Sequence, residues 1–358
     1  MTEEREALRS AVRGLLASYP TRAAIGGPAG YDAGLWARLC KEIGVAGLAV
    51  PPEYGGAGAG LLETHVVLEE LGRRLTPSPM LGAVLAGQAL LRSGDLEACE
   101  RLLPAICTGD VIAAVAFDPF SSSIMPSSPP TSAGLPSPAS LTASGGRLSG
   151  ELQHVLDAGV ADVLLVIARG GVWEVDASTV HRQPEESLDL TRRLSTVRLD
   201  DVPARRLGDD PEPTLWDIGC VALSAEQIGA AAQALELTLE YAKTRHQFGR
   251  PIGSFQVLQH RLAEAHVRVE AARSASWTAV EALVAGDPQA YRPAAVAKVC
   301  CSETLQVVAA EMVQIHGGIA ITWEHDAHLY LRRAYASAQL FGSPAQHVER
   351  LAFAAGLA

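Results

Sequence analysis

The sequence lacks the features of several classes of protein. Only 5% of its residues are aromatic and 19% are charged, whereas 48% are hydrophobic, a composition that excludes disorder as the main state of the chain. Positive charge is in deficit, since 29 Lys and Arg stand against 40 Asp and Glu and leave a formal charge of −11. A negative field of this kind repels nucleic-acid phosphates and anionic lipid. Nucleic acid is therefore not an expected partner.

Long apolar runs and paired cysteines are also missing. No stretch reaches the roughly 18 uninterrupted apolar residues that a membrane-spanning helix needs. The first ten residues, MTEEREALRS, contain no basic region followed by an apolar one. The six cysteines form no CxxC pair and no ligand spacing, so we expect buried thiols in a reducing compartment. The sequence predicts a cytoplasmic protein without a membrane span.

The chain of 358 residues is long enough for two or three domains. Apolar residues recur at intervals of three and four in residues 1–110, which predicts an N-terminal α-helical domain. Residues 111–210 predict a middle β-sandwich or barrel-like domain with a Ser/Pro-rich surface loop at 119–146. Its expected strands are 161–168, 171–176 and 195–207. Helical periodicity returns in five segments of residues 211–358 and predicts a helical bundle.

The segment YAKTRHQFGRPIGSFQVLQHRLAE, residues 241–264, predicts a helical hairpin. We expect its first helix to end at Gly249, Pro251 to lie in the turn, and Ser254 to cap the second helix. The turn is rich in groups that bind ligands. Its candidate residues are Arg245 and Arg250 for an anionic group, Phe248 for a planar ring and Gln256 for directional hydrogen bonds. The alternative is that the two arginines only interact with the helix dipole.

A second candidate segment is VQIHGGIA, residues 313–320. A helix is expected to stop at the adjacent residues Gly317 and Gly318, which is a common C-terminal signal. The functional alternative is that these glycines let an extended or flat cofactor touch the backbone, with Gln314 as a hydrogen-bonding partner.

Other catalytic and metal-binding patterns are weak. The chain has no GxSxG nucleophile elbow. His325 and His328 lie three residues apart beside Glu324 and Asp326, but no third metal ligand is apparent, and capping of a helix explains the pattern equally well. We expect no metal site.

Together, these motifs resemble the acyl-CoA dehydrogenase family. The resemblance is carried by RHQFGRPIGSFQVLQHRLAE, by QIHGG followed by a helix with paired arginines, and by the early VPPEYGGAG, and it covers nearly the whole chain. It implies an α+β multi-domain fold with an N-terminal helical domain, a middle β domain and a C-terminal four-helix bundle. It also implies a dimer or tetramer with FAD between subunits. The residues implied to contact the FAD of the neighbouring subunit are Arg245, Phe248, Gln256, Gln314, Gly317 and Gly318.

The chain departs from the family where the flavin ring and the catalytic base belong. The family's Thr-Glu-Pro-x-x-Gly-Ser-Asp loop corresponds to residues 117–119, Phe-Asp-Pro. Its aromatic-Ile-Thr/Ser flavin contact corresponds to residues 155–157, where Asp157 would be unfavourable beside a reduced, anionic flavin. Its usual base, the Glu of a Glu-Gly-Thr motif, is replaced by Phe341. The alternative position of the base holds His246 and Gln247, so we expect no catalytic residue in this chain.

The resemblance therefore implies a division of labour. The chain resembles the base-lacking subunit of an actinobacterial α2β2 acyl-CoA dehydrogenase that acts on steroid side-chain CoA thioesters. The implied partners are a homologous base-bearing subunit, an acyl-CoA substrate and an acceptor like electron-transfer flavoprotein. Two alternatives stay open: a self-sufficient homo-oligomer with His246 or a distant carboxylate as base, and a flavin-free acyl-CoA binding or scaffold protein.

Overall fold

The computed structural model describes residues 2–25, 27, 29–116, 141–168, 171–209 and 211–357. The helices of the N-terminal part are α1 (Glu3–Leu16), α2 (Thr21–Ile25), α3 (Ala33–Arg38), α4 (Leu61–Arg73), α5 (Met80–Ser93) and α6 (Leu96–Cys107), joined by the short turns η1 (Leu39–Ile43), η2 (Val45–Gly47) and η3 (Pro52–Tyr54). In VPPEYGGAG, Gly55 has φ 80°, and a Cβ at Gly56 would overlap the carbonyl of Val50. This turn therefore needs its glycines, as the sequence indicates.

The middle part contains two four-stranded sheets. Their strands are β1 (Ala113–Ala116), β2 (Thr142–Ser144), β3 (Arg147–Leu156), β4 (Val163–Ala168), β5 (Gly171–Asp176), β6 (His181–Pro184), β7 (Leu194–Pro203) and β8 (Arg205–Gly208), with short turns η4 (Ala158–Val160) and η5 (Ala177–Thr179). One sheet has the order β1-β4-β5-β8 and the other β2-β3-β7-β6, and all neighbours are antiparallel except β1 and β4.

Strand β4 explains how the sheets are layered. Leu164 and Val166 enter the core between the two sheets, whereas Leu165 and Ile167 enter the core shared with the N-terminal helices. Because successive side chains of a strand point to opposite faces, a continuous apolar run marks a strand that is covered on both sides. The predicted runs at 161–168 and 171–176 correspond to β4 and β5, whereas the run at 195–207 is two strands, β7 and β8, which belong to different sheets.

The Ser/Pro-rich loop is predicted to extend over residues 119–146, but this prediction is wrong for its last residues. Residues Thr142–Ser144 form β2, which pairs with the start of β3 through a turn at Gly145 and Gly146. Both glycines have positive φ, 58° and 74°, as a two-residue hairpin requires. Residues 119–140 of the predicted loop lie outside the described residues.

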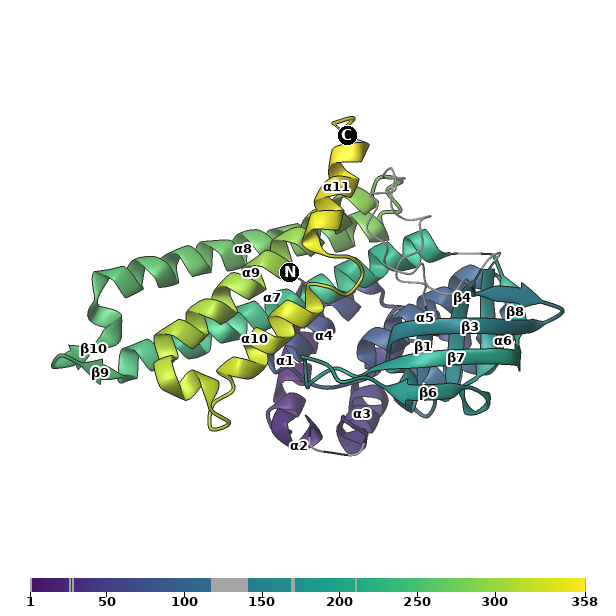
Figure 1. Ribbon diagram of the computed structural model, residues 1–358, viewed down its shortest axis with the longest axis horizontal. Helices are drawn as coiled ribbons and strands as arrows, with labels where there is room; N and C mark the ends of the chain where they lie inside the picture. The colour runs from purple at the N-terminus through teal and green to yellow at the C-terminus, as the bar shows by residue number, and fades with distance from the viewer. Residues whose placement is uncertain are drawn as a thin grey trace.

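The C-terminal part is helical, as predicted. Its elements are α7 (Glu212–Thr244), β9 (His246–Gln247), β10 (Arg250–Pro251), η6 (Ile252–Ser254), α8 (Gln256–Val284), α9 (Tyr291–His316), η7 (Gly317–Ile321), α10 (Ala327–Ser337) and α11 (Pro344–Ala354). Figure 1 shows the long helices side by side, with the sheets at one end and the β9–β10 hairpin at the other.

Helices α7 and α9 are long and apolar enough to pass a test for membrane spans by length and composition. However, 94% of the apolar window of α7 is buried inside the structure. Its apolar residues pack against the N-terminal helices and against α9. We therefore interpret α7 as a core helix of the bundle rather than as a membrane span.

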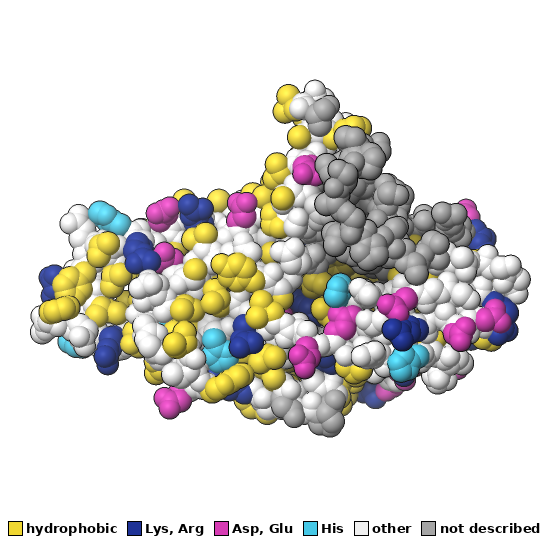
Figure 2. Space-filling view, in the orientation of Figure 1, with side chains coloured by type: hydrophobic (Ala, Val, Ile, Leu, Met, Phe, Trp, Pro, Cys, Tyr) yellow, Lys and Arg dark blue, Asp and Glu magenta, His cyan; other side chains and the backbone are white. Residues whose placement is uncertain are grey.

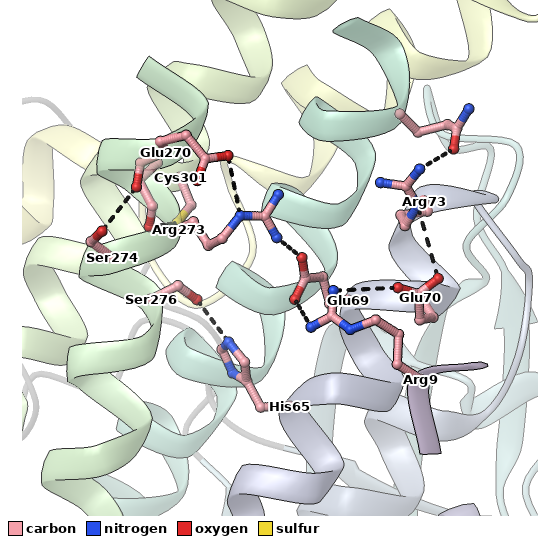
Figure 3. Close-up of polar contacts among 12 residues, drawn as sticks. Arg9, His65, Glu69, Glu70, Arg73, Glu270, Arg273, Ser274, Ser276 and Cys301 are labelled. Carbon is pink, nitrogen blue, oxygen red and sulfur yellow. Dashed lines mark hydrogen bonds and ion pairs between the residues drawn. The ribbon is translucent and has the colours of Figure 1, made fainter. Parts of the chain in front are cut away.

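A buried charge cluster joins the N-terminal helices to the bundle (Figure 3). Glu69 of α4 has a fully buried side chain and pairs with Arg9 of α1 and with Arg273 of α8. Its neighbour Glu70 pairs with Arg13 of α1 at 2.8 Å. Because a buried carboxylate is costly unless paired, these arginines fix three helices relative to one another.

Candidate functional site

The candidate ligand-binding segment begins with a hairpin at the tip of the bundle (Figure 1). Helix α7 ends at Thr244, so the predicted helix end at Gly249 is wrong. Strands β9 and β10 pair there, with Arg250 opposite Gln247. The turn between them is made by Phe248 and Gly249, at φ 52° and 74°. Two successive residues with positive φ form a tight hairpin turn and cannot continue a helix.

The predicted N-cap at Ser254 is also wrong. Helix α8 begins at Gln256, and its N-cap is Phe255, whose side chain makes no capping hydrogen bond. The hydroxyl of Ser254 instead donates to the carbonyl oxygen of Pro251 at 2.7 Å. This bond stabilises η6, which leads from the hairpin into α8.

Four of the predicted residues lie exposed around this turn. Arg245 has an exposed side chain and no ion-pair partner within the described part of the chain. The Arg250 guanidinium lies 4.0 Å above the ring centroid of Phe255. Phe248 is 92% exposed, and its ring lies edge-on to Phe255 at 6.1 Å. With the exposed Gln256, the turn presents cations, an aromatic ring and an amide to solvent.

The second predicted segment lies next to the first. The ring of Tyr241 stacks on His316 at 4.2 Å between centroids, and its hydroxyl donates to the carbonyl oxygen of His316 at 3.4 Å. Helix α9 stops at His316, and Gly317 follows with φ 66°. A Cβ at Gly317 would meet no atom within 4 Å, so its backbone is open to a ligand.

Gln314 and Gly318 complete the set on the same side. Gln314 is exposed, and a Cβ built on Gly318 also meets no atom within 4 Å. Arg261 of α8 and Glu311 of α9 form an ion pair of 2.6 Å, which also joins the helix after the hairpin to the helix before Gly317. The structure thus brings all six predicted contact residues to one end of the bundle. Chemically, this surface can bind an anionic group that carries a planar ring.

Phe341 lies elsewhere, in the connection between α10 and α11. Its ring lies edge-on to Trp216 at 6.1 Å. A Cβ at Gly219 of α7 would come within 3.0 Å of the Phe341 ring, so the ring rests directly on the helix backbone. Phe341 lines a pocket of about 450 Å³ between the middle part and the bundle. At the position expected for a carboxylate, the pocket wall is apolar.

Two buried side chains hold the segment that carries Phe341. Nε2 of His347 donates to the carbonyl oxygen of Phe341 at 2.7 Å, and burial lowers the pKa of this histidine to about 4. The ammonium of Lys298 donates to the carbonyl oxygen of Ala338 at 2.9 Å, at the end of α10. Burial lowers the pKa of Lys298 to about 8. Sequence reasoning missed both residues, because neither lies in a recognisable motif.

His246 and Gln247 do not approach Phe341. Both are exposed in β9, at the tip of the bundle, whereas Phe341 lies at the connection between α10 and α11 (Figure 1). Nδ1 of His246 donates to the carbonyl oxygen of Thr244 at 3.0 Å. Neither residue lines the pocket that contains Phe341.

Asp157 is buried immediately after β3, at φ 57°. Its Oδ1 pairs with Nη2 of Arg193 at 2.8 Å. Burial raises the pKa of Asp157, and the charge of Arg193 works in the opposite direction. The guanidinium of Arg193 also donates to the carbonyl of Gly30 and lies 4.9 Å over the Tyr31 ring. Sequence reasoning identified Asp157 but missed Arg193, for which the only local signal is the pair of adjacent arginines.

The remaining sequence candidates have other roles or cannot be placed. Nδ1 of His325 accepts the backbone N–H of Ala327 at 3.1 Å, so this histidine contributes to the start of α10. Among the described residues, no group of three His, Cys, Asp or Glu is arranged to hold a metal ion. The cysteines are free thiols, buried except for the half-buried Cys300. The predicted departure at residues 117–119 lies outside the described residues.

The folded chain matches known proteins over almost its whole length. Residues 2–110 match the family model for the acyl-CoA dehydrogenase N-terminal domain, and residues 217–355 match that for the C-terminal domain. The acyl-CoA dehydrogenase IpdE2 of Mycolicibacterium smegmatis is 40% identical, over 98% of this chain and 98% of the relative. IpdE2 of Mycobacterium tuberculosis is 39% identical, over 98% and 96%. The chain therefore belongs to the acyl-CoA dehydrogenase family, whose members are FAD-dependent oxidoreductases acting on CH–CH bonds.

The names of two similar solved structures each contain two proteins. The Tcur3481–Tcur3483 steroid ACAD has a TM-score of 0.88 and 31% identity, over 99% of this chain and 98% of that chain. The ChsE4–ChsE5 complex from Mycobacterium tuberculosis has a TM-score of 0.88 and 29% identity, over 100% and 98%. The fold class expected from the sequence is thereby confirmed.

Proposed function

We propose that this chain is the base-lacking subunit of a heteromeric acyl-CoA dehydrogenase, in which it contributes to the FAD site of a homologous, base-bearing partner. The observation that carries the proposal is the contrast between two regions. The tip of the bundle presents an exposed guanidinium without an ion-pair partner in the described chain, together with open glycine backbone. Phe341 stands where the carboxylate is expected, and the buried Asp157 stands where the hydroxyl-bearing flavin contact is expected.

The tip residues fit the pyrophosphate and ring portions of FAD. In the proposed arrangement Arg245 holds the pyrophosphate, Phe248 packs beside it, and Gln256 and Gln314 supply directional hydrogen bonds. Gly317 and Gly318 allow close approach of the cofactor. When bound, FAD supplies the hydride acceptor for the dehydrogenation of an acyl thioester. The chain's own role is to bind and orient the cofactor.

The residues around Asp157 do not fit a flavin ring in the same way. The carboxylate is buried and already occupied by Arg193 at 2.8 Å, and its charge would oppose a reduced, anionic flavin. The ring of Phe341 cannot accept a proton, so we assign no catalytic residue to this chain. Catalysis is proposed to need the partner's base.

Exposed apolar side chains support a partner at the bundle tip. Phe248, Ile321 and Trp323 are 92%, 76% and 63% exposed. Figure 2 shows hydrophobic side chains gathered over the bundle half of this face. Large exposed apolar surface beside a proposed cofactor site is typical of a surface that another subunit covers. The paired proteins in the similar structures support a homologous partner in an α2β2 assembly.

The substrate proposed is a steroid side-chain CoA thioester, in which an α,β double bond is formed. This proposal is supported by the words "steroid ACAD" in the name of one similar structure. We further propose electron transfer to an acceptor like electron-transfer flavoprotein and a cytoplasmic location.

The decisive experiment is a visible absorption spectrum and a mass determination, on the chain alone and on the chain co-expressed with a base-bearing acyl-CoA dehydrogenase. The proposal expects a colourless lone chain and a yellow complex with about two flavins per four chains. A lone chain with one flavin each that reduces a dye with acyl-CoA would establish the self-sufficient enzyme instead. A complex without flavin at Arg245 would establish the flavin-free alternative.

A further inference from the structure

Three aromatic rings from different parts of the bundle lie against one another beside the glycine pair. The ring of Tyr241, near the end of α7, stacks on His316, the last residue of α9, with 4.2 Å between centroids and 24° between planes. The ring of His316 also contacts the ring of His325, which precedes α10, at 4.4 Å between centroids. Because His316 directly precedes Gly317, this ring cluster adjoins the backbone that is proposed to contact FAD.

Each histidine of the ring cluster has a backbone partner that fixes the position of a ring hydrogen. Nδ1 of His316 lies 2.7 Å from the carbonyl oxygen of Met312. A carbonyl oxygen can only accept, so Nδ1 of His316 carries the hydrogen. The backbone N–H of Ala327 donates to Nδ1 of His325 at 3.1 Å. A backbone N–H can only donate, so Nδ1 of His325 carries no hydrogen, and an imidazolium could not make this bond.

The bond between Ala327 and His325 also begins helix α10. Asp326 is the N-cap of this helix, but its side chain makes no capping hydrogen bond. Its carboxylate instead pairs with Arg22 of α2 at 2.6 Å. The first amides of a helix need partners outside the helix, and the ring nitrogen of His325 supplies one, as an N-cap side chain does. Protonation of this nitrogen removes the acceptor and frees the start of α10 from the ring cluster.

The loop between the two histidines, residues 317–324, has little burial of its own. All of its residues except Ala320 are exposed, including the large side chain of Trp323. A loop that is not held by a core depends on the contacts at its ends. At these ends lie the ring contact of His316 with His325 and the bond that starts α10.

The groups around His325 favour its neutral form. Burial lowers the pKa of His325, the charge of Arg22 lowers it further, and Asp326 works in the opposite direction. Burial also lowers the pKa of His316 and of His328, which lies on the first turn of α10. An unperturbed histidine gains its proton near pH 6.5. The neutral ring of His325 therefore stabilises the folded loop fully above about pH 6.5, and this contribution is lost as pH falls below that value.

We propose that His325 is a positioning residue for the FAD site, whose neutral ring holds the loop of residues 317–324 in place and whose protonation weakens FAD binding. This inference rests on the proposed function and adds a regulation by pH to the same site.

Other histidines near the site act in the opposite direction. His246 is exposed in β9, and Nε2 of the exposed His260 lies 3.5 Å from the amide nitrogen of Gln256. Their protonation adds positive charge beside a proposed pyrophosphate site, which strengthens the binding of an anion in acid. A loss of FAD in acid is therefore opposite in sign to the effect of these charges.

The test measures the FAD affinity of the complex with a base-bearing partner at pH 7.5 and at pH 5.5. Flavin that leaves the complex on dilution is detected by its fluorescence. We expect the dissociation constant of the wild type to rise about three- to tenfold between the two pH values, since one capping hydrogen bond is lost. This range stays above the pKa of His347, about 4.

Variants of His325 separate its ring from its acceptor. His325→Asn keeps an oxygen that accepts the amide two residues along the chain and cannot be protonated, so its FAD affinity should change less than about twofold over the same range. His325→Phe keeps a ring without an acceptor and should bind FAD about three- to tenfold more weakly already at pH 7.5. His181→Asn, at an exposed residue of the edge strand β6, is the matched control and should keep the wild-type pH dependence.

A second readout requires no flavin. Hydrogen exchange of the amides of residues 317–327, corrected for the intrinsic effect of pH, is measured on the full chain alone and in the complex. Protection of these amides should fall between pH 7.5 and pH 5.5 in the wild type and persist in His325→Asn. A purely structural role of His325 would give no such difference in pH response.

Two results would overturn the proposal. One is an equal change of FAD affinity with pH in the wild type and in His325→Asn, in a complex whose FAD depends on Arg245. The other is a wild-type loop whose protection is the same at both pH values. A complex that holds no FAD, or holds it equally well after Arg245→Ala, refutes the proposed function instead. Loop protection in the lone chain then decides by itself whether His325 positions the loop.

Discussion

At the scale of single residues, Arg245 has the most direct expected effect. Its charge-assisted bond to a desolvated pyrophosphate is worth roughly 1.5 to 3 kcal/mol. Arg245→Ala should therefore lower the affinity of the complex for FAD by about tenfold or more, measured by flavin release during dialysis. Lys243→Ala is the matched control, because Lys243 is nearby, exposed and paired with Glu240 at 2.7 Å. Equal flavin retention in both variants would contradict the assignment of Arg245.

The buried pair of Asp157 and Arg193 makes a prediction about pH. Arg193→Ala should destabilise the chain by about 3 to 5 kcal/mol at neutral pH, because it leaves a buried carboxylate without its partner. Burial already raises the pKa of Asp157 above its unfolded value, and loss of Arg193 should raise it further. A raised carboxylate pKa favours the folded state at low pH, and this contribution is lost as pH rises.

The difference in unfolding free energy between Arg193→Ala and wild type should consequently be smaller at pH 5 than at pH 7.5, in urea titrations. The Asp157→Asn, Arg193→Ala double variant supplies the control, since it has no carboxyl group to titrate at residue 157. A pH-independent difference for the single variant would show that Asp157 is not the group responsible.

At the scale of elements, the crossing of α4 and α7 depends on two glycines. A Cβ at Gly229 would overlap the carbonyl oxygen of Glu69, and one at Gly72 would overlap that of Glu226. Gly229→Ala should lower the unfolding free energy by at least about 2 kcal/mol, because the helices must separate. This sign is the reverse of the usual helical preference for alanine.

Gly14→Ala on α1 provides the comparison for that experiment. A Cβ there meets no atom within 4 Å, so we expect a gain of about 0.5 to 1 kcal/mol. Thermal and urea unfolding of both variants measure the two signs. A neutral or stabilising Gly229→Ala would mean that the crossing tolerates a wider separation than the structure indicates.

His347 of α11 is buried against α7, with its Nε2 3.7 Å from Sγ of Cys220. Burial lowers the pKa of His347 to about 4, below its unfolded value of about 6.5. The neutral ring favours folding fully above pH 6.5, and this contribution, roughly 3 kcal/mol in total, is lost as pH falls toward 4. His347→Gln keeps a donor for Phe341 and should make unfolding free energy fall less steeply over that range. His181→Gln, at an exposed site, should leave the steepness unchanged.

At the scale of the whole molecule, we expect that placing a glutamate at residue 341 does not give this chain dehydrogenase activity by itself. Phe341→Glu places a carboxylate against Trp216 and the backbone of α7. We expect no acyl-CoA-dependent dye reduction by this variant alone, and a lower melting temperature because the new charge is partly buried. The complex with a base-bearing partner is the positive control. Turnover by the lone variant would refute the division of labour.

Much of the architecture follows from the sequence. The helical period in LLETHVVLEELGRRL predicts α4, and the continuous apolar run ADVLLVIA predicts β4, because a strand covered on both faces leaves such a run. The period of α4 suggests one buried face, but residues 64–72 are all buried in the structure. The residue types at the two helix breaks mark the tip residues as candidates, and the family resemblance assigns them to FAD. β3 was missed, since Gly150 and the bulge at His154 interrupt its alternation, and the Gly145-Gly146 turn that starts it was interpreted as loop.

By itself the sequence determined the order of helical and β regions and the acyl-CoA dehydrogenase family, and it predicts that Phe341 stands in place of the usual base. These features depend on local periodicity and on short motifs, which are readable along the chain. The tertiary structure alone decided that Arg193 neutralises Asp157, that His347 and Lys298 hold the segment around Phe341, and that His325 packs against His316. Each of these contacts joins residues that are distant in the chain or placed by an irregular backbone, so their partners follow only from how the elements pack.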